Sequence, residues 1–386
     1  MSTVEVSMID GLEGEQLNAF VRCVDHLVSK VYGKYLIFNA PGGTGKTYVL
    51  RKVISYLKSQ NMNIAVIAYT GRAASQLSRD GLEATTCHSL LYKPRFDANQ
   101  NVIGWDEKHR DEVLAECSDG IVVDEGSMIP YSIHLLLDRL GVQIIYTGDH
   151  DQLDPVEPGN DVEFNTMTTL SRNLVTLKEN RRFGIDTGIG YITTHLRQQN
   201  SIPRIKKDGL VYVRKSAVLT EKFHHTNKFD TILCGMNKTR KKINQLVRQA
   251  RGYYDSIPEV GETVVCLRNN ILRQGGKINN GELFIVQAVF PGEKTSTFML
   301  LDEYGEKTIS VDVMNETWES EKAPMTQAGT SVQVFGFGYC LSVHKAQGST
   351  FGSVLFVDED VSFFLDQRKF RYTATSRAAN LLTVAI

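Results

Sequence analysis

The chain has 386 residues, of which 42% are hydrophobic, and its formal net charge is −1 at pH 7. This length predicts two or three domains, each with a hydrophobic core of its own. The near-neutral charge argues against a protein whose whole surface is basic and binds nucleic acid. Six cysteines occur singly, with no C-x-x-C pair and no histidine at metal-ligand spacing, so we expect reduced thiols in a cytoplasmic protein. We expect neither a signal peptide nor a membrane anchor, because no stretch has the required apolar run.

The charge is unevenly distributed along the chain. Residues 201–251 contain thirteen Lys or Arg against three Asp or Glu, which gives this window a net charge of +10. Such a window is either a solvated surface or a track for a polyanion. Composition alone favours neither interpretation.

The first predicted helix covers residues 12–28 and carries Gln16. A carboxamide offers one hydrogen-bond donor and one acceptor side by side, so Gln16 could pair with the edge of an adenine. The alternative is a glutamine exposed on the surface of the helix.

Residues 38–47, F-N-A-P-G-G-T-G-K-T, follow an apolar run and precede apolar residues at helical spacing. A strand, a glycine-rich loop and a helix form the context of a phosphate-binding loop. Gly42, Gly43 and Gly45, with Thr44 between them, would let successive N–H groups point at one phosphate. Ala40 stands where the usual pattern has glycine, at a position where alanine should cost little because a residue leaving a strand keeps ordinary dihedral angles.

The residues that end this loop supply the chemistry expected for ATP. Lys46 would reach the β and γ phosphates, and the Thr47 hydroxyl would bind Mg²⁺. The run I-V-V-D-E-G-S-M predicts a buried strand that ends at Asp124 and Glu125. Asp124 would face the Mg²⁺, and Glu125 would take a proton from the attacking water. After the next strand, Gln152 in G-D-H-D-Q-L-D-P is expected to sense the γ-phosphate.

Other polar residues follow strand ends, where open parallel sheets bind their ligands. The strand at 64–68 leads to Thr70 and Arg72, and the segment T-C-H-S supplies His88 and Ser89. We expect these four residues to contact a polyanionic ligand.

Residues 91–106 predict a β-hairpin with a turn at 97–101. Phe96 or Trp105 would then be exposed and could act as a wedge, or both rings could fold inward. The charged residues 106–112 are expected to form a solvated connector.

The order of these motifs, A-P-G-G-T-G-K-T, A-Y-T-G-R-A-A, T-C-H-S, D-E-G-S-M and G-D-H-D-Q-L-D-P, closely resembles that of superfamily-one B helicases of the RecD branch. The resemblance implies an α/β fold with two RecA-like P-loop motor domains, a small β-hairpin in the first and an SH3-like β-barrel in the second. The implied domain 1A covers residues 1–175, with the hairpin insertion at about 90–118. Domain 2A covers 176–257 and 335–386, and the barrel, domain 2B, covers 258–334.

The same resemblance assigns residues in the second half of the chain. In L-K-E-N-R-R-F, Arg182 is preferred over Arg181 as an arginine that reaches the γ-phosphate, and Arg377 in Y-T-A-T-S-R-A is the second. Asn237 begins a basic helix, and in the segment S-V-H-K-A-Q-G-S the implied contacts with the DNA strand are Ser342, His344 and Lys345. Gln347 and Gly348 would face the nucleotide, which would lie between the motor domains.

The implied function is an ATP- and Mg²⁺-dependent DNA helicase that moves 5′ to 3′ on single-stranded DNA in replication, recombination or repair. Its partners would be single-stranded DNA, junctions of single- and double-stranded DNA and a single-strand-binding or other replication protein, but no membrane. A phage origin would place it in the host cytoplasm. Two alternatives remain open, which are an RNA-directed motor of the same superfamily and a nucleotide-gated DNA-binding or loading module that does not unwind.

Overall fold

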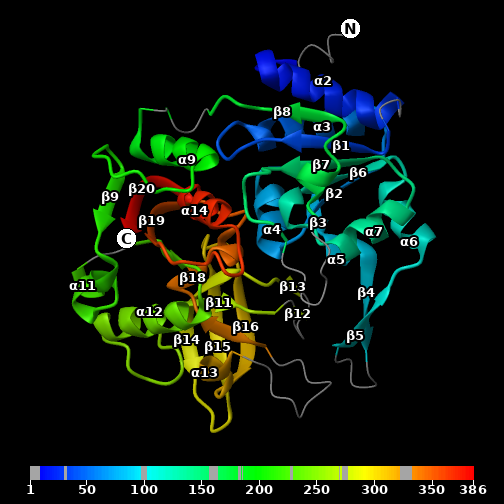
Figure 1. The fold of residues 1–386 in the computed structure, drawn as a ribbon. Coiled ribbons are helices and arrows are strands. Elements are labelled where there is room, and N and C mark those ends of the chain that lie inside the picture. The colour runs from blue at the N-terminus through cyan, green and yellow to red at the C-terminus, as the bar shows by residue number, and fades with distance from the viewer. Residues whose placement is uncertain are drawn as a thin grey trace. The chain divides into compact units, whose positions relative to one another are not determined.

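The structure is a computed structural model that describes residues 9–29, 33–96, 102–155, 164–180, 184, 186–226, 229–268, 270–271, 277–321 and 333–386. The chain divides into two compact units (Figure 1). The first comprises Met1–Lys93 and Asp106–Asp186, and the second comprises Pro94–Trp105 and Thr187–Ile386.

The first unit is built on a six-stranded parallel sheet with the order β3-β2-β6-β7-β1-β8. Its strands are β1 (Tyr35–Asn39), β2 (Ile64–Ala68), β3 (Ala84–Thr86), β6 (Gly120–Asp124), β7 (Ile144–Gly148) and β8 (Leu174–Thr176). Its helices are α2 (Gly14–Ser29), α3 (Lys46–Ser59), α4 (Gly71–Arg79), α5 (Cys87–Leu91), α6 (Arg110–Cys117), α7 (Tyr131–Arg139), α8 (Thr166–Thr169) and the short 3₁₀ turn η1 (Gly126–Met128). The strands predicted around the loop and the paired acids are therefore present.

Both faces of this sheet are buried, which explains the unbroken apolar runs in the sequence. Successive residues of β1 point to opposite faces: Leu36 and Phe38 pack in the cluster formed with α2 and α3, and Ile37 packs in the cluster formed with α6 and α7. Figure 1 shows these helix pairs on the two sides of the sheet.

The predicted hairpin consists of β4 (Tyr92–Phe96) and β5 (Val102–Glu107), and its predicted turn lies outside the described residues. Phe96 and Trp105 are 49% and 42% exposed, so the rings do not fold inward. The expectation of a connector at 106–112 is wrong, because β5 extends to Glu107 and α6 begins at Arg110. Asp111 and Glu112 lie in the first turn of α6, where acidic side chains are favoured by the helix dipole.

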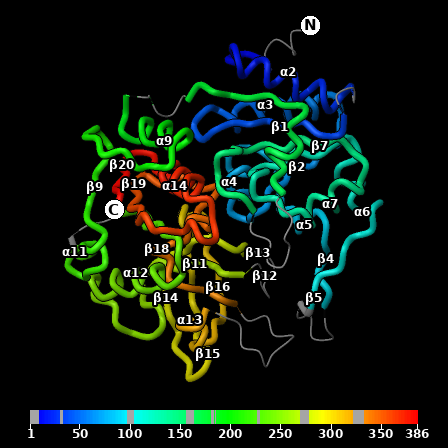
Figure 2. The backbone as a smooth tube through the Cα atoms, in the orientation of Figure 1, coloured from blue at the N-terminus to red at the C-terminus, as the bar shows by residue number. Residues whose placement is uncertain are grey.

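The second unit contains a five-stranded parallel sheet with the order β18-β10-β19-β20-β9. Its strands are β9 (Leu210–Val213), β10 (Thr231–Cys234), β18 (Cys340–Ser342), β19 (Phe351–Val357) and β20 (Ala378–Ala385). Its helices are α9 (Gly188–Gln198), α10 (Lys215–Val218), α11 (Glu221–Thr226), α12 (Asn237–Ala250), α14 (Gln367–Thr375) and the 3₁₀ turn η2 (His344–Ala346). The colours in Figure 2 show that strands from distant parts of the chain, green and orange to red, come together in this sheet.

A five-stranded antiparallel sheet, with the order β16-β15-β14-β11-β17, interrupts the second unit. Its strands are β11 (Thr263–Cys266), β14 (Leu283–Phe290), β15 (Thr295–Asp302), β16 (Thr308–Met314) and β17 (Phe335–Phe337), joined by α13 (Thr317–Ser320) and the small pair β12 (Asn270–Ile271) and β13 (Lys277–Ile278). Trp318 forms the centre of its core, with its ring centroid 5.3 Å from that of Phe298 and 6.1 Å from that of Phe335. This sheet therefore has a hydrophobic core of its own.

All six cysteines are buried and free, as the sequence predicts. Burial raises the pKa of the Cys23 and Cys87 thiols to about 12, so both are protonated at neutral pH. Within the described residues, no helix is long and apolar enough to cross a membrane.

Candidate nucleotide and nucleic-acid sites

The glycine-rich loop joins the end of β1 to the start of α3. Gly43 and Gly45 have φ angles of 87° and 90°, in the left-handed region that glycine adopts at little cost. A Cβ atom at residue 45 would also lie 2.3 Å from Nε2 of Gln16. Ala40 donates its N–H to the carbonyl of Gly148 at 2.7 Å, which continues the pairing of β1 and fits the expectation that alanine is tolerated there.

Gln16 lies beneath this loop and is 4% exposed, which rules out the alternative of a glutamine exposed on the helix. Its Nε2 donates to the carbonyl oxygen of Thr44 at 3.1 Å, and the Thr44 hydroxyl donates to the carbonyl of Pro41 at 2.8 Å. Oε1 of Gln16 has no hydrogen-bond partner among the described residues. Gln16 therefore supports the loop with its donor and retains an acceptor that a ligand could use.

Lys46 begins α3 and meets the two acids at the end of β6. Its Nζ forms an ion pair with Oδ1 of Asp124 and lies 3.8 Å from Oε1 of Glu125. Burial alone would lower the pKa of Lys46, but the charges of Asp124, Glu125 and then Asp149 outweigh it and raise the pKa above its usual value. Lys46 is therefore a permanent cation beside the loop, as a phosphate ligand requires.

The two acids differ in their backbone surroundings. Asp124 is the last residue of β6 and accepts a hydrogen bond from the Thr147 hydroxyl at 3.4 Å. Glu125 follows with a φ angle of 51°, an uncommon value for a residue with a side chain. This backbone turn gives the two adjacent carboxylates different positions, one beside the lysine and one farther from it.

Oxygen ligands suitable for Mg²⁺ are present in this region. Thr47 is half-buried in the first turn of α3, and carboxylate and hydroxyl oxygens are the donors that Mg²⁺ prefers. The segment after β7 brings ligand atoms of Asp149, His150 and Asp151 within 4.8 Å of one another. Gln152 beside them is 3% exposed, and its Oε1 has no hydrogen-bond partner in the described part of the chain.

The residues predicted to contact a polyanion follow β2 and β3, at the carboxyl edge of the first sheet. Thr70 caps α4 by accepting the Ala73 N–H at 3.2 Å, and Arg72 is buried in the same helix. Ser89 lies in the first turn of α5, which Thr86 caps.

His88 lies next to two aromatic rings. Its ring centroid is 6.0 Å from that of Tyr69 and 5.7 Å from that of Tyr92, the first residue of the hairpin. His88 therefore connects the carboxyl edge of the sheet with the base of the hairpin.

In the second unit, the predicted strand contacts also gather at a carboxyl edge. Asn237 is exposed at the start of α12, just after β10, and Ser342 ends the neighbouring strand β18. His344 and Lys345 follow in η2. Burial lowers the pKa of His344, and burial followed by the charge of Arg240 lowers the pKa of Lys345 to about 8.

Arg377 is held within its own unit and is 5% exposed. Its Nε donates to the carbonyl of Thr373 at 3.1 Å, its Nη1 donates to that of Ser349 at 3.2 Å and its Nη2 donates to the Ser376 hydroxyl at 2.9 Å. Gly348 precedes Ser349 with a φ angle of 75°. Arg181 and Arg182 lie outside the described residues.

Two buried ion pairs were not predicted from the sequence. Arg240 of α12 forms a bidentate pair with Glu321, and Arg248 of α12 binds Glu262 with distances of 2.8 and 2.9 Å. The two arginines are eight residues apart on the buried face of α12, and both acids belong to the antiparallel sheet region. Part of the basic window is therefore structural. The sequence did contain a signal for this, because Arg240 and Arg248 occur at helical spacing with the apolar residues Ile243 and Val247 on the buried face of α12.

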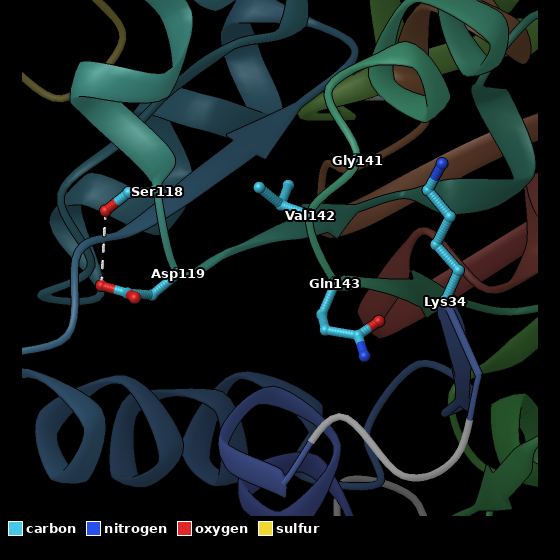
Figure 3. A pocket seen from close by; sticks show the side chains of 6 residues that line it. All are labelled: Lys34, Ser118, Asp119, Gly141, Val142 and Gln143. Atoms are coloured by element: carbon cyan, nitrogen blue, oxygen red, sulfur yellow. Dashed lines mark hydrogen bonds between the residues drawn. The ribbon is translucent and has the colours of Figure 1, made fainter.

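A cavity of about 380 Å³ lies at the opposite, amino-terminal edge of the first sheet (Figure 3). Its lining includes Lys34, Asp119 and Gln143, which precede β1, β6 and β7. The cavity is thus separate from the glycine-rich loop.

Comparison with known proteins supports a common origin for most of the chain. The sequence profile of the AAA domain matches residues 14–213, and that of the UvrD-like helicase C-terminal domain matches residues 337–385. The ATP-dependent RecD2 DNA helicase of Deinococcus radiodurans is 24% identical to this chain over 395 aligned residues. The alignment covers 95% of this chain. The ATP-dependent DNA helicase Dda of Enterobacteria phage T4 is 31% identical over 160 residues, or 40% of this chain.

The AAA-domain profile covers more than half of the chain, so the chain belongs to that family, and its relatives indicate the RecD/Pif1 group of superfamily-one B helicases. It spans 48% of RecD2 and 35% of Dda. Among solved structures, the Bacteroides Pif1 helicase in complex with ADP-AlF3 and single-stranded DNA has a TM-score of 0.60 at 18% identity, and the alignment covers 96% of this chain and 92% of that one. The Candida albicans Pif1 helicase has a TM-score of 0.56 at 19% identity, with 97% and 94% covered. The two parallel sheets are therefore the two RecA-like domains that the RecD-branch resemblance implies.

Proposed function

We propose that the chain is an ATP-dependent DNA helicase that moves 5′ to 3′ along single-stranded DNA and separates the strands of a duplex. The arrangement of Lys46, Asp124 and Glu125 beside the glycine-rich loop carries this proposal, because it combines a phosphate ligand, a metal ligand and a base. Similarity to RecD2, Dda and Pif1, which are DNA helicases, supports strand separation as the task of such a site.

In this proposal, the first unit binds ATP and Mg²⁺. The backbone of Gly42, Gly43, Thr44 and Gly45 cradles the phosphates, and Gln16 offers its acceptor to the base. Thr47 and Asp124 would hold Mg²⁺, which would neutralise charge on the phosphates. Glu125 orients the attacking water and takes its proton, and Gln152 responds to the γ-phosphate.

Residues of the second half complete the chemistry. Arg182 and Arg377 would stabilise charge on the γ-phosphate in the transition state, because the guanidinium group stays charged and can bridge two oxygens. Gly348, with Gln347, would lie near the nucleotide. Movement of the domains on ATP binding and hydrolysis would then advance the chain along DNA.

The DNA track in this proposal uses the two carboxyl edges. In the first domain it comprises Thr70, Arg72, His88 and Ser89, and in the second it comprises Asn237, Ser342, His344 and Lys345. The exposed rings of Phe96 and Trp105 would separate the base pairs at the junction.

We infer a domain division close to residues 1–175, 176–257 with 335–386, and 258–334. Because β8 ends at Thr176 and β17 (Phe335–Phe337) pairs in the antiparallel sheet, the first and third of these domains each extend slightly beyond the inferred boundary. The antiparallel order β16-β15-β14-β11-β17 supports an SH3-like barrel as the third of these, because such barrels consist of short antiparallel strands. A role in cytoplasmic DNA replication, recombination or repair, beside a single-strand-binding protein, fits this assignment.

A strand-separation assay tests the proposed function. Duplexes with a 5′ tail, a 3′ tail or blunt ends are incubated with the chain, with and without ATP and Mg²⁺. We expect ATP-dependent separation of the 5′-tailed duplex alone, because the chain must load on single-stranded DNA behind the junction. Equal separation of the 3′-tailed duplex would contradict the polarity, and ATP hydrolysis with no separation of any duplex would favour the loading module.

The RNA-directed alternative predicts a different preference. If RNA is the track, ATP hydrolysis should be stimulated more by an RNA oligomer than by DNA of the same sequence, because the site must then accept the 2′-hydroxyl. We expect stronger stimulation by DNA.

A further inference from the structure

Two phenylalanines are exposed in the segment between β19 and α14. Phe363 is 75% exposed and Phe364 is 50% exposed. Their rings meet edge to face, with centroids 4.6 Å apart. Two adjacent exposed rings form an apolar patch, and such patches often mark an interaction site.

The segment that carries these rings is held firmly by hydrogen bonds. Residue 359 is a buried glutamate whose Oε2 accepts the N–H groups of Gly235 and Met236 at 2.7 and 3.0 Å. Oε1 of Gln367 accepts the N–H of Val361 at 2.8 Å, and the N–H groups of Phe364 and Leu365 donate to the carbonyl of Val361. The backbone is therefore ordered before any ligand binds, which lowers the entropy cost of binding.

The position of the rings follows from the order of the strands. β19 pairs with β10, and β10 pairs with β18, all in parallel. The segments after these three strands consequently emerge at one edge of the sheet. The segment after β19 carries the two phenylalanines, the segment after β10 carries Asn237, and the segment after β18 carries Lys345. Glu359 joins the first of these segments to the second by its hydrogen bonds to residues 235 and 236.

We propose that Phe363 and Phe364 form a stacking platform for a base of single-stranded DNA. This inference rests on the proposed function, because it extends the strand contacts of the second domain. A phenyl ring has no hydrogen-bonding group, so the platform would accept any base through its face. It adds a contact with the bases to a track whose other predicted members in the second domain, Asn237, Ser342, His344 and Lys345, are polar or basic.

The two acidic residues that flank the rings favour a base over a phosphate as the contact. Asp360 and Asp366 are exposed on either side of the phenylalanines. Asp360 accepts hydrogen bonds from Ser362, and Asp366 caps α14 by accepting the N–H of Lys369 at 2.9 Å. Their negative charges repel phosphate oxygens and leave the uncharged rings to contact the neutral bases.

The test compares the affinity for two strands of equal length, an oligothymidine and an abasic strand with the same phosphates. The double variant F363A/F364A should bind oligothymidine roughly tenfold more weakly, on the scale of one lost base stack. Its affinity for the abasic strand should change less than twofold, because no base is there to stack. The control is F290A, which removes a phenylalanine that is 59% exposed on β14 in the antiparallel sheet.

An unchanged affinity of the double variant for oligothymidine would overturn the platform and would point to a protein as the ligand of the rings. An equal loss on both strands would also overturn it, because the effect would then not depend on bases. Failure of the unaltered chain to bind single-stranded DNA would instead contradict the proposed function. Circular dichroism of the double variant checks that its fold is retained.

Discussion

Lys46, Asp124 and Glu125 meet because two parallel strands end at the same edge of a sheet. The sequence predicted this meeting from a glycine-rich loop and an Asp-Glu pair 78 residues later, because each motif follows an apolar run that only a buried strand explains. The left-handed backbone at Glu125 could not be predicted, since it arises where the chain turns from β6 into η1.

Replacement of Glu125 by glutamine should separate binding from hydrolysis. Glutamine keeps the shape of the side chain but cannot accept a proton, so ATP binding should survive while DNA-stimulated hydrolysis falls by about 100-fold or more. Nucleotide affinity and steady-state phosphate release measure the two effects. The control is E112Q, at an exposed carboxylate on α6, which should behave as the unaltered chain does; a twofold or smaller loss in E125Q would contradict the role of Glu125 as the base.

We expect Lys345 to make the affinity for single-stranded DNA dependent on pH. Its pKa is lowered to about 8, chiefly by burial and then by Arg240 of α12, while the charge of Glu321 acts in the opposite direction. The ammonium is therefore charged below pH 8 and neutral above it. If Lys345 binds a DNA phosphate, affinity should fall severalfold between pH 7 and pH 9, on the scale of one lost phosphate contact.

The variant K345R provides the matched comparison. Arginine stays charged throughout this range, so its affinity for single-stranded DNA should change less with pH than that of the unaltered chain. Titrations of a labelled oligonucleotide at constant ionic strength measure both. Identical pH profiles for the two proteins would show that Lys345 does not carry the dependence.

At the scale of elements, the sequence predicted strands and helices with strong periodicity and missed the distant contacts that hold them in place. α12 was predicted as a basic helix, yet Arg240 and Arg248 are buried in ion pairs with Glu321 and Glu262. These acids lie 81 and 14 residues away in the chain. No local pattern identifies such partners, because they come together only when the chain folds.

The hairpin of β4 and β5 should couple ATP hydrolysis to strand separation. Phe96 and Trp105 are exposed, and the base of the hairpin contacts His88 through Tyr92. In the double variant F96A/W105A, the number of base pairs separated per ATP should fall severalfold, while hydrolysis stimulated by single-stranded DNA stays within about twofold, because the rings lie outside the nucleotide site.

Simultaneous recording of phosphate release and strand separation gives this ratio, and F290A again serves as the control for loss of an exposed ring. An unchanged ratio in F96A/W105A would mean that the hairpin aromatics are not the wedge. If the ratio is reduced, the single variants F96A and W105A would show which of the two rings is the wedge.

For the whole molecule, the sequence predicted two parallel α/β sheets and an antiparallel insertion, and all three sheets are present. Alternating apolar residues in 283–314 predicted the strands of the insertion, because each strand buries one face in the core around Trp318. The sequence did not predict that β17 belongs to this sheet, because the three residues F-G-F are too few to show an alternating pattern.

The central claim is that the chain turns over ATP while it moves along single-stranded DNA. The most direct measurement is the steady-state rate of ATP hydrolysis on saturating DNA strands of increasing length, from one binding site upward. A motor that reaches the end of a short strand dissociates and must bind again before it travels further. We therefore predict a rate of ATP hydrolysis that rises with strand length and then levels off. A rate that is the same on every strand long enough to bind would contradict the account, because it describes a switch that hydrolyses ATP without travelling.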